Sequence, residues 1–376
     1  MDYGIPYEDT VVGLSGFAGL DLNHVNHWTR LPAERSIVAG KGYYKAGFTM
    51  LANGDLLASP CYQDNENNKM RIAMFKSNDV GRSWEKLEIA GDELLGKEPA
   101  LQTLRSGRVL LITSHPHGFR ISRSDDEGVT WKTTAIGNAP ETIDFVDIDF
   151  GMMRNVLEND DGSLWIFMTR GKYYDDTAPP SKCWIYASSD DGETWEEKQE
   201  IPVWDSPEAM FDEGQIIRIA DDRMLGVGRV TSNVPIDDGP LPYGPPVPNG
   251  DHAGDHMIIA RSTDGGLTWS QPDPLFKYSE VHAHIVCLRD GRLLCSYLSY
   301  HLPWGIYAVT SDDGGDTWDY DHPMQLSLSV NHTTGWPTSI ELEDGSIITL
   351  YATTPYPVKD PQEWVSVTEC VRWRLP

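Results

Sequence analysis

One eight-residue pattern, Ser-x-Asp-x-Gly-x-Thr/Ser-Trp, occurs five times in this chain and constrains its fold more than any other feature. The copies are Ser77–Trp84, Ser124–Trp131, Ser188–Trp195, Ser262–Trp269 and Ser311–Trp318. The Asp can accept hydrogen bonds from the backbone of the turn that it starts, and the Gly supplies a position with positive φ. The Trp then packs the turn onto its own sheet. We interpret these aspartates as structural rather than catalytic, and we call the pattern the Asp box.

A second repeat lies between the Asp boxes and consists of an apolar run, a turn and another apolar run. Its turn residues are Gly54, Gly107, Gly162, Asp222, Gly291 and Gly345. Asn-Gly, Asp-Gly and Ser-Gly between apolar runs are typical of β-hairpins. Six hairpins at a spacing of roughly 55–60 residues predict an all-β fold, a six-bladed β-propeller with five Asp-box turns. We expect one domain over residues 1–376.

The last blade lacks an Asp box and must be completed in another way. We expect it to close with a strand from one end of the chain, either VTECVRWRL or the N-terminal segment.

Charge and composition limit the classes of partner. The formal net charge of −27 argues against nucleic acid or an anionic membrane as a partner, although a local arginine cluster could still bind a small anion. No run of 18 apolar residues predicts a membrane span, and the first ten residues do not resemble a signal peptide. We therefore expect a cytoplasmic protein, or a secreted one whose signal has been removed. The five cysteines show no CxxC spacing, which indicates buried free thiols, and no cofactor is expected.

The register of the hairpins predicts which residues surround the central channel. The first strand of each hairpin should be the innermost strand of its blade, and its start should point into the channel. Counting nine residues back from each turn gives Lys45, Glu98, Met153, Glu213, His282 and Trp336. In blade three the turn looks one residue longer, so we take Arg154 as the equivalent. A ring of polar groups at one end of a channel is typical of a binding site.

The returning strands of the hairpins add four arginines, Arg71, Arg120, Arg170 and Arg229. Arg71 and Arg120 lead toward Asp boxes, so we expect them outside the channel. Arg229 ends its strand and should lie on the same rim as Glu213.

Asp boxes in a six-bladed array resemble the sialidase superfamily, from Lys45 to the end of the chain. In that family an arginine triad holds the substrate carboxylate, a Tyr–Glu pair supplies the nucleophile, and an Asp is the acid/base. The resemblance implies that Glu213 is the family's Glu and that Arg229 is one of its arginines. In CYQDNENN, Asp64 or Glu66 stands where the family has its Asp.

Three positions depart from the pattern of that family. Lys45 replaces the first arginine, residues 293–310 hold no arginine where the third is expected, and Trp336 replaces the nucleophilic Tyr. An indole has no ionisable hydroxyl, so nucleophilic catalysis of the Tyr type is not expected here. We interpret Trp336 as a platform on which a sugar stacks.

Three functions remain open on these residues. The first is an exo-acting glycoside hydrolase on a terminal acidic sugar, whose carboxyl groups would come from Glu98, Asp212, Glu213 and Asp64. In it Lys45, Arg154 and Arg229 would hold the carboxylate of the sugar. The second is a lyase acting on a uronate-containing glycan, with chemistry from His282, His284, Tyr297 and His301. The third is a propeller that binds glycans without catalysis.

The longest irregular stretch, residues 231–256, links the hairpin of blade four to the strands that carry the fourth Asp box. It contains GDHAGDH, in which Asp251, His252, Asp255 and His256 include a His-x3-His spacing. In a loop rich in Pro and Gly such residues more often form a solvated turn. We therefore predict no metal site.

Overall fold

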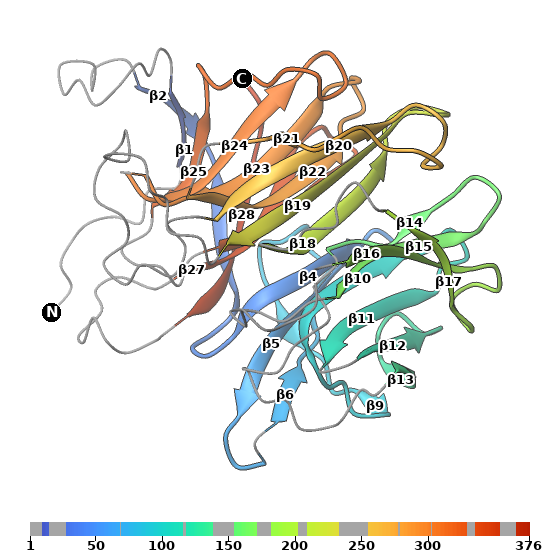
Figure 1. The fold of residues 1–376 in the computed structure, drawn as a ribbon. Coiled ribbons are helices and arrows are strands. Elements are labelled where there is room, and N and C mark those ends of the chain that lie inside the picture. The colour runs from blue at the N-terminus through green and yellow to red at the C-terminus, as the bar shows by residue number, and fades with distance from the viewer. Residues whose placement is uncertain are drawn as a thin grey trace, which may run out of the picture.

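The computed structural model describes residues 10–14, 28–67, 69–115, 118–137, 154–170, 182–201, 209–232, 255–276, 279–301, 303–328, 335–353 and 366–376. The regular elements in these ranges are all β-strands, and they form six sheets (Figure 1). The prediction of an all-β six-bladed propeller is confirmed. Over the same ranges there is no helix of the length and apolarity that a membrane crossing requires.

Blades one to three follow one another along the chain. Blade one contains β4 (Tyr44–Met50), β5 (Leu56–Asp64), β6 (Lys69–Ile72), β7 (Phe75–Ser77) and β8 (Glu85–Lys86). Blade two contains β10 (Lys97–Thr103), β11 (Val109–His115), β12 (Gly118–Ser124) and β13 (Thr130–Gly137), with β9 (Ala90–Gly91) added parallel to β13. Blade three contains β14 (Leu157–Glu158), β15 (Leu164–Arg170), β16 (Lys182–Ser188) and β17 (Glu196–Glu200).

Blades four to six complete the ring. Blade four contains β18 (Ala209–Arg218), β19 (Met224–Ser232), β20 (His256–Ser262) and β21 (Asp273–Pro274). Blade five contains β22 (Glu280–Cys287), β23 (Leu293–Ser299), β24 (Gly305–Ser311) and β25 (Met324–Leu328). Blade six contains β26 (Gly335–Glu341), β27 (Ile347–Thr353) and β28 (Val367–Trp373). The first strand of each hairpin lies at one edge of its sheet, where β4 meets β10 and β22 meets β26.

The Asp boxes have the expected internal geometry. In the second box, Asp126 Oδ1 accepts hydrogen bonds from the Thr130 amide at 2.8 Å and the Ser124 hydroxyl at 2.8 Å. Gly128 has φ of 90°, and the indole N–H of Trp131 donates to the Gly128 carbonyl at 2.9 Å. The aspartates of the other four boxes accept the same bonds from the residue before the Trp. This confirms the turn chemistry inferred from the repeats.

The glycine of each box also packs against the preceding blade. A Cβ on Gly128 would lie 2.9 Å from a methyl of Leu57 in blade one, and one on Gly315 would lie 2.6 Å from Leu225 in blade four. The first box reaches blade six in the same way, since a Cβ on Gly81 would lie 3.2 Å from Ile348. Positive φ and close approach together require glycine, so the boxes also hold neighbouring blades together.

The N-terminal part of the chain completes two blades. β3 (Glu34–Ala39) pairs with β28 as the outer strand of blade six, while β1 (Thr10–Leu14) and β2 (Trp28–Pro32) extend blade five. Both of the strand sources considered for the last blade are therefore used. In Figure 1 the blue N-terminal strands accordingly lie beside orange and red strands from the end of the chain.

A buried polar cluster fixes β3 in place. Arg35 Nη1 donates to the Tyr351 hydroxyl at 2.7 Å, and Nη2 donates to the Leu326 carbonyl of blade five at 2.5 Å. The Tyr351 hydroxyl donates to Glu369 Oε2 at 2.8 Å. Arg35, Tyr351 and Glu369 therefore form one continuous polar network that links β3 to the other strands of blade six. The side chain of Glu369 is only 1% exposed and depends on these partners.

Arg35→Met should lower the free energy of unfolding by about 3 kcal/mol, because it removes the cation that is ion-paired with the buried Glu369 carboxylate at 3.8 Å. The matched control is Arg82→Met, since Arg82 and Glu34 form a pair that is more than half exposed. The control should cost less than about 1 kcal/mol in urea unfolding. Equal losses in the two variants would contradict a special role for Arg35 at the closure.

Candidate functional site

The inner strands share a backbone distortion at the predicted ring positions. Each of five strand pairs shifts register there, as in a β-bulge, in blades one, two, four, five and six. The residue inside each shift has a left-handed backbone, with φ of 49° to 62° at Lys45, Glu98, Glu213, His282 and Trp336. This conformation costs a non-glycine residue about 1 kcal/mol or more, and such strain is found preferentially at functional sites.

Blade three corrects one part of the prediction. Gly162 N–H donates to the Asn159 carbonyl at 3.0 Å, just as Gly54 N–H donates to Leu51 at 2.9 Å, so the turn is not one residue longer. Met153 is the true equivalent of the ring positions, and it lies outside the described residues. Arg154 occupies the next position, where the other five blades have Ala, Pro or Gly.

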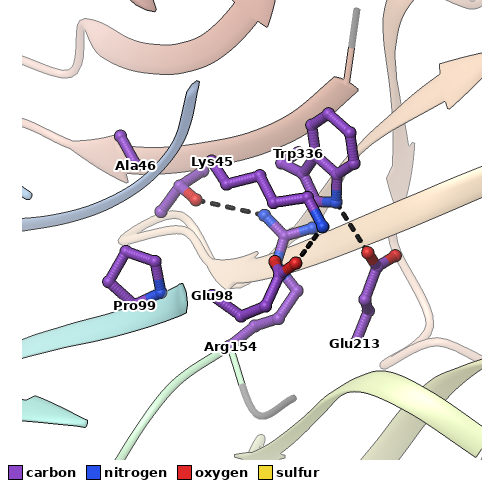
Figure 2. Close-up of a pocket in the computed structure, with 8 residues that line it drawn as sticks. Lys45, Ala46, Glu98, Pro99, Arg154, Glu213 and Trp336 are labelled. Atoms are coloured by element: carbon purple, nitrogen blue, oxygen red, sulfur yellow. Dashed lines mark hydrogen bonds and ion pairs between the residues drawn. The ribbon is translucent and has the colours of Figure 1, made fainter. Parts of the chain in front are cut away.

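The structure brings five of the predicted residues into one pocket, which Figure 2 shows. They are Lys45, Glu98, Arg154, Glu213 and Trp336. Three further lining residues were missed from sequence, namely Ala46, Pro99 and Thr338. These follow the ring positions by one or two residues, so extending the register by two positions would have found them.

Lys45 and Glu98 form an ion pair on one side of the pocket. The Lys45 ammonium also lies 4.4 Å from the ring centroid of Trp336. Burial raises the pKa of Glu98, against the opposing effect of the Lys45 ammonium and with a further contribution from the Glu213 carboxylate. The pocket therefore favours a protonated Glu98 more than water does.

Glu213 is held at both carboxylate oxygens. Oε1 accepts a hydrogen bond from Trp336 Nε1 at 2.6 Å, while Oε2 lies 3.2 Å from His282 Nε2 and 3.4 Å from Arg229 Nε. Burial alone would raise the pKa of Glu213, but Arg229 and His282, together with the more distant cations of the pocket, lower it well below its usual range. Glu213 is therefore an ionised carboxylate.

Arg229 is buried beside Glu213, outside the pocket lining, and it is surrounded by carboxylates. Its Nε and Nη2 donate to the two oxygens of Asp212 at 2.8 and 2.7 Å, and its Nη1 lies 3.4 Å from Asp255. The predicted role of Arg229 as a ligand for a substrate carboxylate is therefore not supported by its contacts. Asp212 is fully buried behind the pocket and lies outside its lining, which argues against the predicted catalytic role.

Arg154 spans the channel from blade three to the opposite blades. Its Nη1 donates to the His282 carbonyl at 3.0 Å, and its Nη2 donates to the Pro337 carbonyl at 2.6 Å and the Thr338 hydroxyl at 3.2 Å. Burial lowers the pKa of Arg154 from its usual value. The guanidinium of Arg154 therefore joins blade three to blades five and six.

Trp336 does not present an open face for a sugar. The His282 ring stacks on the indole at 4.4 Å, with an interplanar angle of 24°, and the Tyr44 ring packs edge-on at 6.3 Å. The Lys45 ammonium also lies over the indole. The part of Trp336 directed at the site is its N–H group, contrary to the stacking platform expected from sequence.

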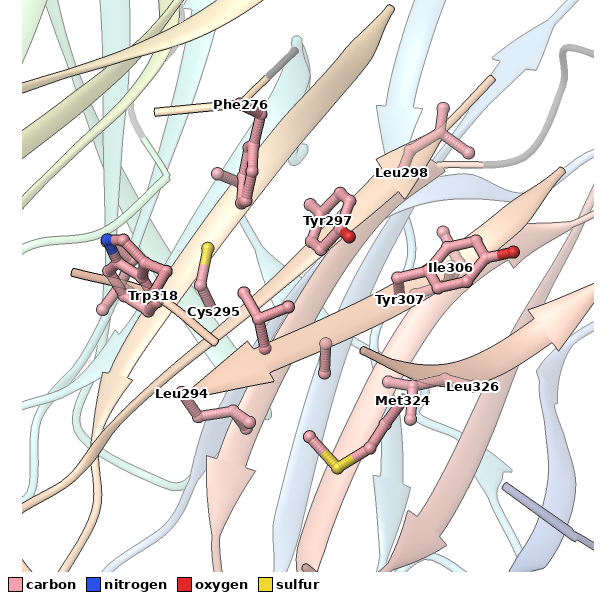
Figure 3. Close-up of a cluster of buried hydrophobic side chains, with 14 of the residues drawn as sticks. Phe276, Leu294, Cys295, Tyr297, Leu298, Ile306, Tyr307, Trp318, Met324 and Leu326 are labelled. Carbon is pink, nitrogen blue, oxygen red and sulfur yellow. The ribbon is translucent and has the colours of Figure 1, made fainter. Parts of the chain in front are cut away.

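The His/Tyr group predicted for a lyase is not assembled. Tyr297 lies in the apolar core of blade five, stacked between Phe276 at 4.2 Å and Tyr307 at 5.9 Å (Figure 3). His301 follows β23, is half-buried and lies outside the pocket lining. His284 is buried beneath the pocket, where its Nδ1 accepts a hydrogen bond from the Ser339 amide at 3.3 Å.

Asp64 and Glu66 lie in the hairpin between β5 and β6, outside the pocket lining. Hydrogen bonds from Asn67, and from Arg71 at 2.7 Å, lower the pKa of Asp64 to about 2. A carboxyl group with so low a pKa is a poor general acid, so the predicted acid role of Asp64 is not supported. Arg71 lies outside the channel, as expected.

The remaining candidates are accounted for as follows. Arg120 lies in β12 outside the pocket lining, and the side chain of Arg170 lies outside the described residues. Asp251 and His252 also lie outside them, and within the described ranges no group of three or more His, Cys, Asp or Glu could hold a metal ion. All five cysteines are free thiols, and Cys287 is exposed rather than buried.

Comparisons with known proteins agree with this fold. Residues 23–197 match the family model of the BNR repeat-like domain. A Dyadobacter fermentans protein of unknown function is 16% identical with a TM-score of 0.66, and the match covers 91% of this chain and 98% of that one. A search of curated proteins found no significant match.

Sialidases are among the structural neighbours. NanB from Streptococcus pneumoniae is 11% identical with a TM-score of 0.55, over 90% of this chain and 69% of that one. A Trypanosoma rangeli sialidase, solved with the inhibitor DANA, is 11% identical with a TM-score of 0.53, over 92% of this chain and 56% of that one. This chain therefore spans little more than half of the trypanosomal enzyme. The chain therefore shares the six-bladed propeller fold of these sialidases, and its first half resembles the BNR repeat-like domain.

His284 predicts a pH dependence of stability. Burial and the nearby Arg154 lower its pKa from 6.5 to about 3, so the folded protein keeps it neutral while the unfolded chain protonates it below about pH 6.5. Stability should therefore fall with decreasing pH between about 6.5 and 3, by about 2 kcal/mol between pH 7 and pH 5.

Urea unfolding of wild type and His284→Gln across this range measures the effect, and the variant should lose most of this slope. His322→Gln, at an exposed histidine, should keep the slope of the wild type. An unchanged slope in His284→Gln would show that this histidine does not contribute to the pH dependence.

Proposed function

We propose that the pocket hydrolyses the glycosidic bond of a terminal sugar, with Glu98 and Glu213 as its paired carboxyl groups. The observation that carries this proposal is that the two groups line one pocket while their environments move their pKa values apart. Glycoside hydrolysis needs one carboxyl group as an acid and a second as a carboxylate, and opposed pKa shifts supply that division.

The proposed roles follow from these shifts. Protonated Glu98 donates its proton to the glycosidic oxygen, which keeps the electron pair of the breaking bond to the anomeric carbon. Glu213 accepts a proton from the water whose oxygen bonds to the same carbon. The products are the free sugar and the alcohol, and no tyrosine nucleophile is required.

The structural neighbours of this chain support a sugar as the class of substrate. A Trypanosoma rangeli sialidase with this fold has been solved with sialic acid. We retain an acidic sugar as the proposed substrate because the cations Lys45 and Arg154 line the pocket. Arg229 would not contribute directly, since it is paired with Asp212.

A glycan-binding propeller without catalysis is the second candidate. The observation in its favour is that Lys45 is paired with Glu98 and that Glu213 is held by Trp336 and Arg229. Binding without turnover of the same glycans would support this alternative. An unsaturated product absorbing in the near ultraviolet would instead indicate elimination.

Glu98→Gln and Glu213→Gln should each lower kcat/KM by about 100-fold or more, because a positioned acid or base typically contributes that much. A panel of aryl glycosides of sialic acid, uronic acids and neutral sugars provides the assay. Activity should fall as pH rises through the raised pKa of Glu98, and again at low pH as Glu213 is protonated. The pH profile of kcat/KM should therefore be bell-shaped.

Asp64→Asn is the control, and it should keep kcat/KM within about twofold because Asp64 is ion-paired with Arg71 outside the pocket. Full activity in both glutamine variants would reject the assignment of the two carboxyl groups. A loss in Asp64→Asn as large as in Glu98→Gln would move the acid to the β5–β6 hairpin.

A further inference from the structure

We propose that Trp336 is a positioning residue that fixes both the orientation and the ionisation of the Glu213 carboxylate. This inference rests on the proposed role of Glu213 as the carboxylate of the site. Trp336 stands where the sialidase superfamily has its nucleophilic Tyr. The proposed positioning role differs both from nucleophilic attack and from stacking on a sugar.

The first contact is direct. The indole N–H of Trp336 donates to Glu213 Oε1 at 2.6 Å, at a site where the carboxylate is 1% exposed (Figure 2). A donor aimed at a buried carboxylate stabilises its ionised form and so lowers its pKa. It also selects one rotation of the carboxyl plane, since an indole N–H points in a single direction.

The second contact acts through His282. The backbone N–H of Trp336 donates to His282 Nδ1 at 3.4 Å, so Nδ1 is the acceptor and the proton of a neutral ring sits on Nε2. Nε2 lies 3.2 Å from Glu213 Oε2. Trp336 therefore acts on both oxygens of Glu213, on one directly and on the other through the tautomer of His282.

The backbone around Trp336 is shaped for these two contacts. Trp336 has φ of 54° and His282 has φ of 62°, so both residues leave the regular strand geometry at the same level of the channel. A Cβ on the preceding residue, Gly335, would lie 2.5 Å from His282 Nδ1, so only glycine lets the chain approach the imidazole so closely. The stacked rings at 4.4 Å then hold His282 against Trp336.

Trp336→Phe tests this inference, because it keeps an aromatic ring and removes the indole donor. The acid limb of the pH profile of kcat/KM should move up by about one pH unit or more, and kcat should fall about tenfold with little change in KM. A 13C carboxyl titration of the protein without substrate should show the same upward shift for Glu213, assigned by its absence in Glu213→Gln.

Trp195→Phe is the matched control, since it removes an indole donor that bonds to Gly192 in an Asp box of blade three. It should move neither the acid limb nor the Glu213 titration. His282→Gln is a second variant, and it should also raise the pKa of Glu213. It replaces Trp336→Phe in the test if Trp336→Phe does not fold.

An unshifted Glu213 titration in Trp336→Phe, or in His282→Gln where Trp336→Phe does not fold, would overturn the inference. A raised KM with unchanged kcat and acid limb would overturn it as well, because that is the result expected of a sugar platform. The titration needs no turnover. A shifted Glu213 titration in a protein that hydrolyses no glycoside would support the positioning contact while rejecting the proposed hydrolase.

Discussion

A left-handed residue in the inner strand of blades one, two, four, five and six is the constraint on which the pocket depends. In a regular strand successive side chains alternate between the two faces of the sheet, so a blade would direct them at its neighbours. The bulges at Lys45, Glu98, Glu213, His282 and Trp336 break this alternation where the strands meet around the axis. The strain is sustained because each bulge is followed by a paired hairpin, and Asp boxes hold neighbouring blades together.

Within that ring, carboxylates compete for a limited set of cations. Arg229 is shared between Asp212, Glu213 and Asp255, whereas Lys45 is paired with Glu98. The unequal sharing separates the two glutamates, because Glu213 gains an arginine, a histidine and an indole donor. Glu98 has the ammonium groups of Lys45 and Lys97, but burial and the neighbouring Glu213 charge raise its pKa, whereas the pKa of Glu213 is lowered.

The sequence was sufficient for the fold and for most of the ring because both depend on local chemistry. Asp-box turns and Gly hairpins are short-range signals. Counting back from the hairpin turns was therefore enough to predict that Glu98 and Glu213 face the channel. Contacts between blades carry no such signal. The burial of Tyr297 against Phe276, the capture of Arg229 by Asp255 and the covering of the Trp336 ring by His282 each join residues from different strands or blades. In blade three, the turn was predicted to be one residue too long, and Arg154 was therefore taken as the ring position instead of Met153.

The pairing of β3 with β28 also has a consequence for how the protein is made. A ribosome completes β3 before any of the blades, whereas β28 emerges only after the rest of the ring. Until then β3 is an unpaired strand whose edge can pair with other chains, and blade six lacks its outer strand. The ring can therefore close only after β28 has been made, and substitutions at Arg35 or Tyr351 should prolong exposure of the β3 edge as well as weaken the finished ring.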